Sequence, residues 1–186
     1  YALCLYYDDV EILMLPISDI IERVHSGQMP DKDQPRYNQQ APVVVWNVNR
    51  ACNMTCPHCY ASASKNPAQD GPTKEQALYV IENLSRAQIK VIIFSGGEPL
   101  LRSDLLQLMA YAREKGMQCH LSSNGTLVSA DLAGKLREVG VSYAGISLDG
   151  SASFNDRYRG LVGGYELALA GLDYLQHCGI RTGLRF

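Results

Sequence analysis

The sequence predicts an α/β fold with a parallel sheet, because short apolar segments alternate with longer segments that carry helix caps. Predicted strands cover residues 42–48, 91–94, 118–122, 143–147 and 181–186. Predicted helices lie between them, over residues 73–87, 103–115, 129–139 and 164–178. Right-handed crossovers would arrange such units either as a TIM-like barrel or as an open doubly wound sheet.

The ends of the predicted helices have recognisable caps. Thr73 and Gln76 have the spacing of a capping box at the start of the first helix. Gly116, Gly140 and Gly179 follow the other three helices, where a residue with positive φ commonly ends a helix. The strands therefore alternate with helices along the whole of this region.

Residues 1–41 are predicted to be an N-terminal extension, with a short helix over 17–25 and a polar linker over 27–41. Residues 42–186 are predicted to form the core domain. The chain begins with Tyr1 and ends inside an apolar segment, which predicts that it is part of a longer protein.

Composition argues against several classes of partner. The net charge is −2 and no block of like charges is present, so neither nucleic acid nor an anionic membrane surface is expected to bind. No apolar segment approaches the roughly 20 residues of a membrane span. The first residues lack the basic region of a signal peptide, and the cysteines do not form a disulfide framework, so a cytoplasmic location is predicted.

The segment 50-RACNMTCPHCY-60 contains three cysteines, Cys52, Cys56 and Cys59, directly after the first predicted strand. Thiolates bind Zn²⁺ or iron–sulfur clusters. A structural zinc site needs four ligands, and a [4Fe–4S] cluster normally uses four cysteines, so three leave one position open. His58 is not expected to be the fourth ligand, because it lies too close to the cysteines on either side. The other cysteines are predicted to pack as small apolar groups; they are Cys4, Cys119 and Cys178.

Each later strand is also followed by a loop that helix–strand packing does not require. These loops are 95-SGGEP-99, 122-SSNGT-126 and 147-SLDG-150. Any of them alone could be an ordinary turn. In a parallel βα barrel, however, active groups lie on the loops after the carboxyl ends of the strands. The sequence therefore predicts a ligand site at this edge, with glycines that let the backbone approach the ligand.

Two arginines in 155-NDRYRG-160 have two interpretations. Arg157 and Arg159 could bind a carboxylate, or they could be an exposed charge pair in a loop. The isolated histidines are predicted to be structural or to lie at the surface; they are His25, His120 and His177.

The C-x3-C-x2-C motif, GGEP and the ISLDG strand end, in this order, resemble the radical S-adenosylmethionine enzymes over residues 42–186. The resemblance implies a partial TIM-like (βα)6 barrel with parallel strands, truncated here after the fifth strand. It also implies that Cys52, Cys56 and Cys59 hold a [4Fe–4S] cluster whose fourth iron binds S-adenosylmethionine. Reductive cleavage would give a 5′-deoxyadenosyl radical, which abstracts a hydrogen atom from the substrate.

The resemblance implies roles for further residues around the cofactor. His58 would lie against the adenine, and Asn124 and Ser122 near the ribose or the sulfonium. Gly96, Gly97 and Glu98 would bind the methionine amino group, Pro99 would shape the turn, and Ser147 and Arg159 would bind the methionine carboxylate.

The phrases FSGGEPLLR, LSSNGTL, YAGISLDG, RYRG and GIRTGLRF are similar to enzymes that trim the side chains of siroheme-derived tetrapyrroles, in heme d1 and alternative heme biosynthesis. This similarity, to a SPASM-type subgroup, implies a tetrapyrrole substrate and removal of acetate carboxyls or propionate arms. It also implies a reductant such as flavodoxin or ferredoxin, and a C-terminal auxiliary-cluster domain outside this chain.

Two alternatives stay open at this point. A peptide-modifying enzyme of the same superfamily would often carry a peptide-recognition domain before the barrel, and residues 1–41 look too short for it. A zinc-binding regulatory module would need a fourth ligand and gives no reason for GGEP.

Overall fold

A computed structural model describes residues 43–67 and 70–186. Five strands form one parallel sheet in the order β1-β2-β3-β4-β5. Their bounds are β1 Val43–Asn47, β2 Val91–Ser95, β3 Gln118–Ser123, β4 Val141–Ser147 and β5 Arg181–Arg185. The predicted helix over 17–25 and linker over 27–41 lie outside the described residues, as do Cys4 and His25.

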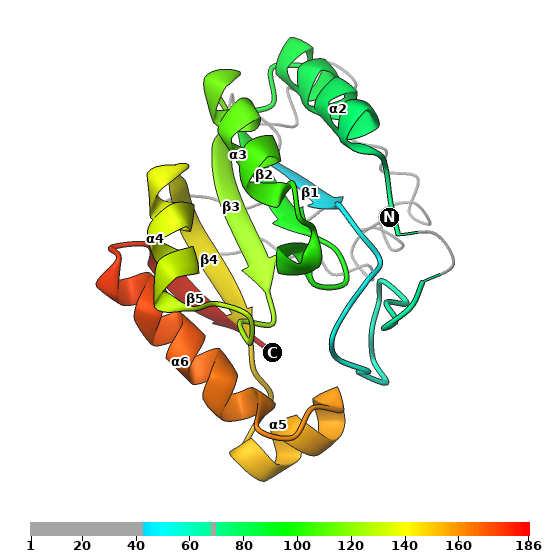
Figure 1. Cartoon of the computed structure of the whole chain (residues 1–186), viewed down its shortest axis with the longest axis vertical. Coiled ribbons are helices and arrows are strands. Elements are labelled where there is room, and N and C mark those ends of the chain that lie inside the picture. The colour runs from blue at the N-terminus through cyan, green and yellow to red at the C-terminus, as the bar shows by residue number, and fades with distance from the viewer. Residues whose placement is uncertain (1–42, 68–69) are drawn as a thin grey trace, which may run out of the picture.

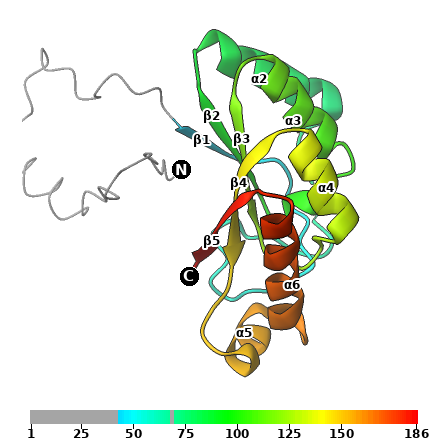
Figure 2. The ribbon, with the colours of Figure 1, turned by 90° about the vertical axis from the view of Figure 1, so that its left-hand side faces the viewer.

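The helices α2, α3, α4 and α6 cover one face of the sheet (Figures 1 and 2). A doubly wound fold would place helices on both faces and reverse its strand order. The consecutive strand order and one-sided helices instead confirm the prediction of a partial TIM-like barrel. The helix bounds are α2 Lys74–Arg86, α3 Leu105–Glu114, α4 Ala130–Glu138, α5 Ala152–Arg159 and α6 Gly164–His177, and a 3-10 turn covers Pro99–Leu101.

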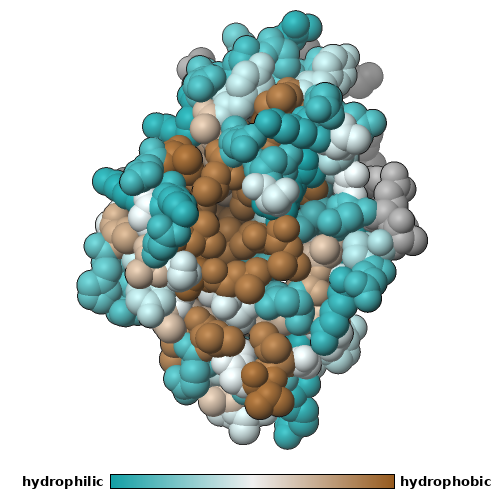
Figure 3. All heavy atoms as spheres, in the orientation of Figure 1, coloured by the Kyte–Doolittle hydropathy of each residue, from teal (hydrophilic) through white to brown (hydrophobic). Residues whose placement is uncertain are grey.

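Alternate strand residues face the helices and form the core. This helix-facing set includes Phe94, Leu121 and Ile146, which are fully buried in one cluster with side chains of the helices. Cys119 belongs to the same cluster and Cys178 packs against it, so their prediction as small apolar groups is confirmed. The side with the helices also brings apolar atoms to the surface, between α3 and α4 and again near α5 (Figure 3).

The predicted caps account for the helix ends. Thr73 Oγ1 accepts from the Gln76 amide at 3.3 Å and Gln76 Oε1 accepts from the Thr73 amide at 3.0 Å, which confirms the capping box. The glycines after α3, α4 and α6 have φ of 84°, 82° and 72°. Helix α3 begins at Leu105, two residues later than predicted, and the carboxylate of its N-cap residue Asp104 binds Arg102 instead of an amide of the helix.

Helix α5 was not predicted, and the interpretation of its segment as a loop was wrong. Arg159 on this helix is 7% exposed and pairs with Asp149, so it is not part of an exposed charge pair. Arg157 is exposed and lies over the Phe154 ring at 5.8 Å. The helix has no apolar stripe that the sequence could reveal, and it ends at Gly160 with φ of 69°.

No helix within the described part of the chain is both long and apolar enough to cross a membrane.

Candidate active site

The cysteine loop, residues 48–64, is attached to the loop that follows β2. The amides of Gly97 and Glu98 donate to the carbonyl oxygens of Asn49 and Ala51 at 3.1 and 2.8 Å. The Asn49 side chain donates back to the Glu98 carbonyl at 2.8 Å. These bonds extend the β1–β2 pairing past the ends of the strands, so the two loops are fixed relative to each other.

The two glycines of this loop are required by the cysteine loop itself. A Cβ on Gly97 would overlap the Ala51 carbonyl oxygen and lie 2.8 Å from its carbon. A Cβ on Gly96, whose φ is 150°, would overlap the Asn49 side chain and lie 2.7 Å from the Asn49 carbonyl oxygen. The predicted reason for these glycines was close approach to a ligand, but in the structure the close neighbour is the protein's own main chain.

Glu98 is fully buried, and its carboxylate joins the loop after β2 to the end of β3. Its carboxylate accepts from the Leu100 amide at 3.1 Å, the Ser123 hydroxyl at 2.8 Å and the Asn124 amide at 2.8 Å. Burial raises the pKa of this carboxyl to about 7, although the three hydrogen bonds oppose the shift. The side chain therefore connects the ends of β2 and β3 beneath the cysteine loop.

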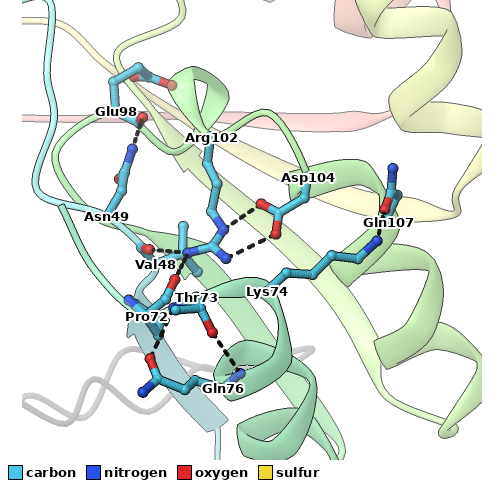
Figure 4. Close-up of polar contacts among 10 residues, drawn as sticks. All are labelled: Val48, Asn49, Pro72, Thr73, Lys74, Gln76, Glu98, Arg102, Asp104 and Gln107. Carbon is cyan, nitrogen blue, oxygen red and sulfur yellow. Dashed lines mark hydrogen bonds and ion pairs between the residues drawn. The ribbon is translucent and has the colours of Figure 1, made fainter.

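Arg102 supports the start of the cysteine loop, and the sequence did not reveal this role (Figure 4). Its guanidinium donates to the carbonyl oxygens of Val48 and Pro72 at 2.8 and 2.9 Å. It also makes a bidentate pair with Asp104, at 2.7 and 3.0 Å. One largely buried cation thus joins the end of β1 to the segments before α2 and α3. The sequence shows an arginine three residues after GGEP, but it does not show that the partners of this arginine are carbonyl oxygens of two other segments.

The three cysteine thiols lie in one loop at different depths. Cys52 is buried, whereas Cys56 and Cys59 are half-buried. The amides of Met54 and Ala63 donate to the sulfurs of Cys52 and Cys59, both at 3.4 Å. Burial raises the pKa of the Cys52 and Cys56 thiols, and for Cys56 the nearby Arg159 partly opposes this.

Among the described residues, no three His, Cys, Asp or Glu side chains are grouped to hold one metal ion. An iron–sulfur cluster does not need that convergence, because each cysteine binds a different iron. Three soft thiols, two of which accept from main-chain N–H groups, therefore fit a cluster with one iron left for another ligand.

Helix α5 is attached to the cysteine loop. The Thr55 amide donates to the Arg159 carbonyl at 3.0 Å, and Cys56 Sγ lies 3.8 Å from the same oxygen. The rings of His58 and Tyr158 stack with centroids 4.4 Å apart and planes inclined by 4°. The exposed His58 thus has a protein ring as its stacking partner, and its predicted contact with adenine stays a prediction.

Asn124 and Ser122, at the end of β3, lie in different surroundings. Asn124 lies beside the cysteine loop: its side-chain Nδ2 donates to Asn53 Oδ1 at 2.8 Å and lies 4.0 Å from Cys52 Sγ. Ser122 lies on the opposite face of the sheet, where its hydroxyl accepts from Arg185 at 2.6 Å. Of these two predicted residues, the structure brings only Asn124 next to a cysteine.

Ser147 is the last residue of β4, and Arg159, at the end of α5, pairs with Asp149 just after that strand. Arg159 Nη2 is 2.5 Å from Asp149 Oδ2, and both side chains are largely buried. The Arg159 Nε atom is buried without a hydrogen-bond acceptor among the described residues. Ser147 is half-buried two residues before Asp149. A buried guanidinium with one donor unused is a suitable site for a carboxylate.

The chain matches the Radical SAM superfamily over residues 46–185. It therefore belongs to the radical SAM superfamily, as the three motifs predicted. Members of this superfamily use a [4Fe–4S] cluster and S-adenosylmethionine, so both predicted cofactors are confirmed. Membership also removes the zinc-binding module from consideration.

Several relatives of the chain are enzymes named after heme synthesis. The chain is 42% identical to Fe-coproporphyrin III synthase of Methanosarcina barkeri over 181 residues, 89% of this chain and 45% of that protein. It is 43% identical to pre-heme d1 synthase of Dinoroseobacter shibae, over 78% of this chain and 36% of that protein. A mycofactocin maturase of Mycolicibacterium smegmatis is 34% identical over 75% of this chain and 36% of its own length. The chain thus spans less than half the length of these relatives.

The fold is also found in solved structures. The structure of native anSMEcpe with bound AdoMet superimposes with a TM-score of 0.65 at 19% identity, and covers 76% of this chain and 42% of that one. This likeness confirms the fold and carries no information about the substrate.

Proposed function

We propose that this chain is the cofactor-binding part of a radical SAM enzyme that modifies the side chains of a siroheme-derived tetrapyrrole in heme or heme d1 biosynthesis. The main support is the cysteine loop, whose position is fixed by main-chain bonds to the loop after β2. When bound, the cluster and S-adenosylmethionine supply a 5′-deoxyadenosyl radical, which removes a hydrogen atom that acid–base chemistry cannot remove.

Different residues of the site would bind the cluster and S-adenosylmethionine. Cys52, Cys56 and Cys59 would bind three irons. Arg159 would bind the methionine carboxylate through its unused Nε donor, assisted by Ser147, while Asp149 holds the guanidinium in place.

The methionine amino group would bind main-chain atoms of the loop after β2. The Glu98 carboxylate is fully buried and already accepts from three protein donors, so its role is to support this loop. Gly96 and Gly97 would bring the same main chain to the cofactor, with Pro99 setting the turn. Asn124, next to Cys52, would lie on the ribose side.

The substrate and the reaction are proposed from the relatives. Fe-coproporphyrin III synthase and pre-heme d1 synthase, at 42% and 43% identity, are more similar to this chain than the mycofactocin maturase, at 34%. We therefore expect removal of acetate carboxyls or propionate arms, with flavodoxin or ferredoxin as the reductant. The cysteines in the described part of the chain are free thiols, which favours the cytoplasm. Residues 42–186 would be the core domain, followed in the whole protein by an auxiliary-cluster domain.

Anaerobic reconstitution with iron and sulfide, followed by reduction and EPR, tests the proposal. The expected result is a [4Fe–4S]⁺ signal that changes when S-adenosylmethionine is added, together with production of 5′-deoxyadenosine. Replacing Cys56 by Ala should abolish both, whereas Cys178→Ala, at the end of α6 and outside the site, should keep both. Retention of zinc without a cluster signal, or cofactor cleavage by Cys56→Ala, would contradict the proposal.

The second candidate is a radical SAM enzyme that modifies a peptide. The observation that favours it is the similarity to mycofactocin maturase, at 34% identity. Didecarboxysiroheme and a precursor peptide encoded near the gene can be compared as substrates under the same reducing conditions. Consumption of the peptide alone would favour this candidate.

A further inference from the structure

The sulfur of Cys52 has a side-chain amide as well as a main-chain amide beside it. The Met54 amide donates to Cys52 Sγ at 3.4 Å, and Asn124 Nδ2 lies 4.0 Å from the same sulfur. Cys52 is 8% exposed and Asn124 is 7% exposed, so the contact is largely shielded from water. The orientation of the Asn124 side chain therefore decides which kind of atom faces the buried sulfur.

Main-chain contacts determine this orientation. Asn124 Oδ1 accepts from the Thr126 amide at 3.0 Å, across a turn in which Gly125 has a φ of 78°. A main-chain N–H group can only donate, so the atom of Asn124 that faces it must be the oxygen. The other branch of the side chain, Nδ2, is therefore the one that faces Cys52. The Asn124 main-chain amide donates to the Glu98 carboxylate at 2.8 Å, which holds the residue in place.

Asn53 and Thr126 complete a closed ring of hydrogen bonds with Asn124. Asn124 Nδ2 donates to Asn53 Oδ1, Asn53 Nδ2 donates to Thr126 Oγ1, and the Thr126 hydroxyl donates to Asn124 Oδ1, each at 2.8 Å. The direction of every bond in the ring follows from the position of the Asn124 oxygen. Because Nδ2 carries two hydrogens, one serves Asn53 and the second is directed to the Cys52 sulfur.

An N–H group that faces a cluster ligand affects how easily the cluster is reduced. Reduction adds one negative charge, which the irons share with the sulfurs. A nearby N–H dipole stabilises the reduced state more than the oxidised state, and this raises the reduction potential. In a buried site the effect is larger, because the local dielectric constant is low. Asn124 is thus placed to favour reduction of a cluster that is bound through Cys52.

We propose that Asn124, oriented by the ring with Asn53 and Thr126, donates to the Cys52 sulfur and raises the reduction potential of the cluster. Asn53 and Thr126 are positioning residues, since they act through Asn124. The assignment rests on the proposed function, because it takes Cys52 to be a cluster ligand. It adds to that function a control over the electron transfer from the reductant.

A redox titration of the full-length protein without S-adenosylmethionine, followed by EPR, tests this assignment. The signal that Cys52→Ala lacks identifies the cluster of this site. Asn124→Leu keeps nearly the same side-chain size and removes the N–H groups. At a fixed potential, its ratio of reduced to oxidised cluster should fall about three-fold or more, because a hydrogen bond to a charged group is among the stronger polar contacts.

Two further variants give the comparison its scale. Asn53→Ala leaves the Asn124 donor in place but removes one of its anchors, so the ratio should fall by less than in Asn124→Leu. Asn83→Leu makes the same chemical change at an exposed position of α2 and should give the wild-type ratio.

The outcomes separate the inference from the proposed function. If Cys52→Ala keeps every cluster signal of the wild type, Cys52 is not a ligand, and both the proposed cluster site and the inference are wrong. If Cys52→Ala lacks a signal but Asn124→Leu keeps the wild-type ratio, the inference is wrong while the proposed function stands. Weaker binding of S-adenosylmethionine by Asn124→Leu, with an unchanged potential, would assign Asn124 to the cofactor alone and would also overturn the inference.

A second measurement applies if Asn124→Leu does not take up a cluster. Pulsed EPR of the reduced wild type, with isotopically labelled nitrogen in the asparagine side chains, should show a hyperfine coupling between such a nitrogen and the cluster. A side chain with a purely structural role would give no coupling, and its absence would overturn the inference.

Discussion

Replacing Glu98 by Gln should change how the stability of the protein depends on pH. Burial raises the pKa of the Glu98 carboxyl to about 7, from its usual value of 4.5. The folded state therefore keeps this proton at pH values where the unfolded state has lost it. The stabilisation from this group is complete below about pH 4.5 and is lost as the pH rises through about 7, by linkage. Glutamine has a similar shape and does not titrate, so it removes this dependence.

The size of the effect follows from the shift. A difference of about 2.5 pKa units corresponds to roughly 3.4 kcal/mol between the low-pH and high-pH limits. About 2.5 kcal/mol of this falls between pH ~5 and pH ~8. Any constant cost of placing an amide group opposite the Asn124 or Leu100 amides is the same at both pH values and cancels in the comparison.

Urea unfolding of the cluster-free protein under reducing conditions measures this difference. Between the two pH values, the wild type should lose about 2.5 kcal/mol more unfolding free energy than Glu98→Gln. Glu138→Gln, on the exposed side of α4, should behave like the wild type. Parallel pH dependences of wild type and Glu98→Gln would show that burial does not control this carboxyl, and the reasoning would be refuted.

The remaining predictions concern contacts that hold the site together. Gly97→Ala should lower the free energy of unfolding by about 2 kcal/mol and reduce iron content and cofactor affinity, because the new Cβ meets the main chain of the cysteine loop. Gly134→Ala, in open space on α4, is the control. Normal iron content in Gly97→Ala would contradict this role. Asp149→Asn should destabilise the protein by about 3 kcal/mol in urea unfolding, because it leaves the largely buried Arg159 without its counter-charge. Asp131→Asn, in an exposed pair, should have a much smaller effect, and equal losses in the two variants would sink the argument from burial.

Local sequence signals predicted most of the fold. Thr73 with Gln76, and glycines such as Gly116 and Gly140, act within a few residues, so the ends of α2, α3 and α4 were visible in the sequence. The positions of the cysteines after β1 and of GGEP after β2 were predicted for the same reason. Parallel strands then bring those loops to one edge whatever their composition.

Contacts between distant segments were not predictable. The partners of Arg102, Glu98 and Arg159 are main-chain or side-chain groups from other loops, and a single sequence does not show such pairings. Helix α5 was missed because its stabilising contacts are with the cysteine loop and with α6, and it has no apolar stripe of its own. The glycines of GGEP were placed correctly, but the neighbour that requires them was not foreseen.

The attachment of α5 to the cysteine loop has a consequence for the order of assembly. Cys56 Sγ and its neighbour, the Arg159 carbonyl oxygen, are separated by 103 residues in sequence. The three cysteines leave the ribosome long before α5 does, so the loop forms its contacts with α5 only late in synthesis. We therefore expect a ribosome-bound chain that stops before Arg159 to retain a cluster less well than the complete chain.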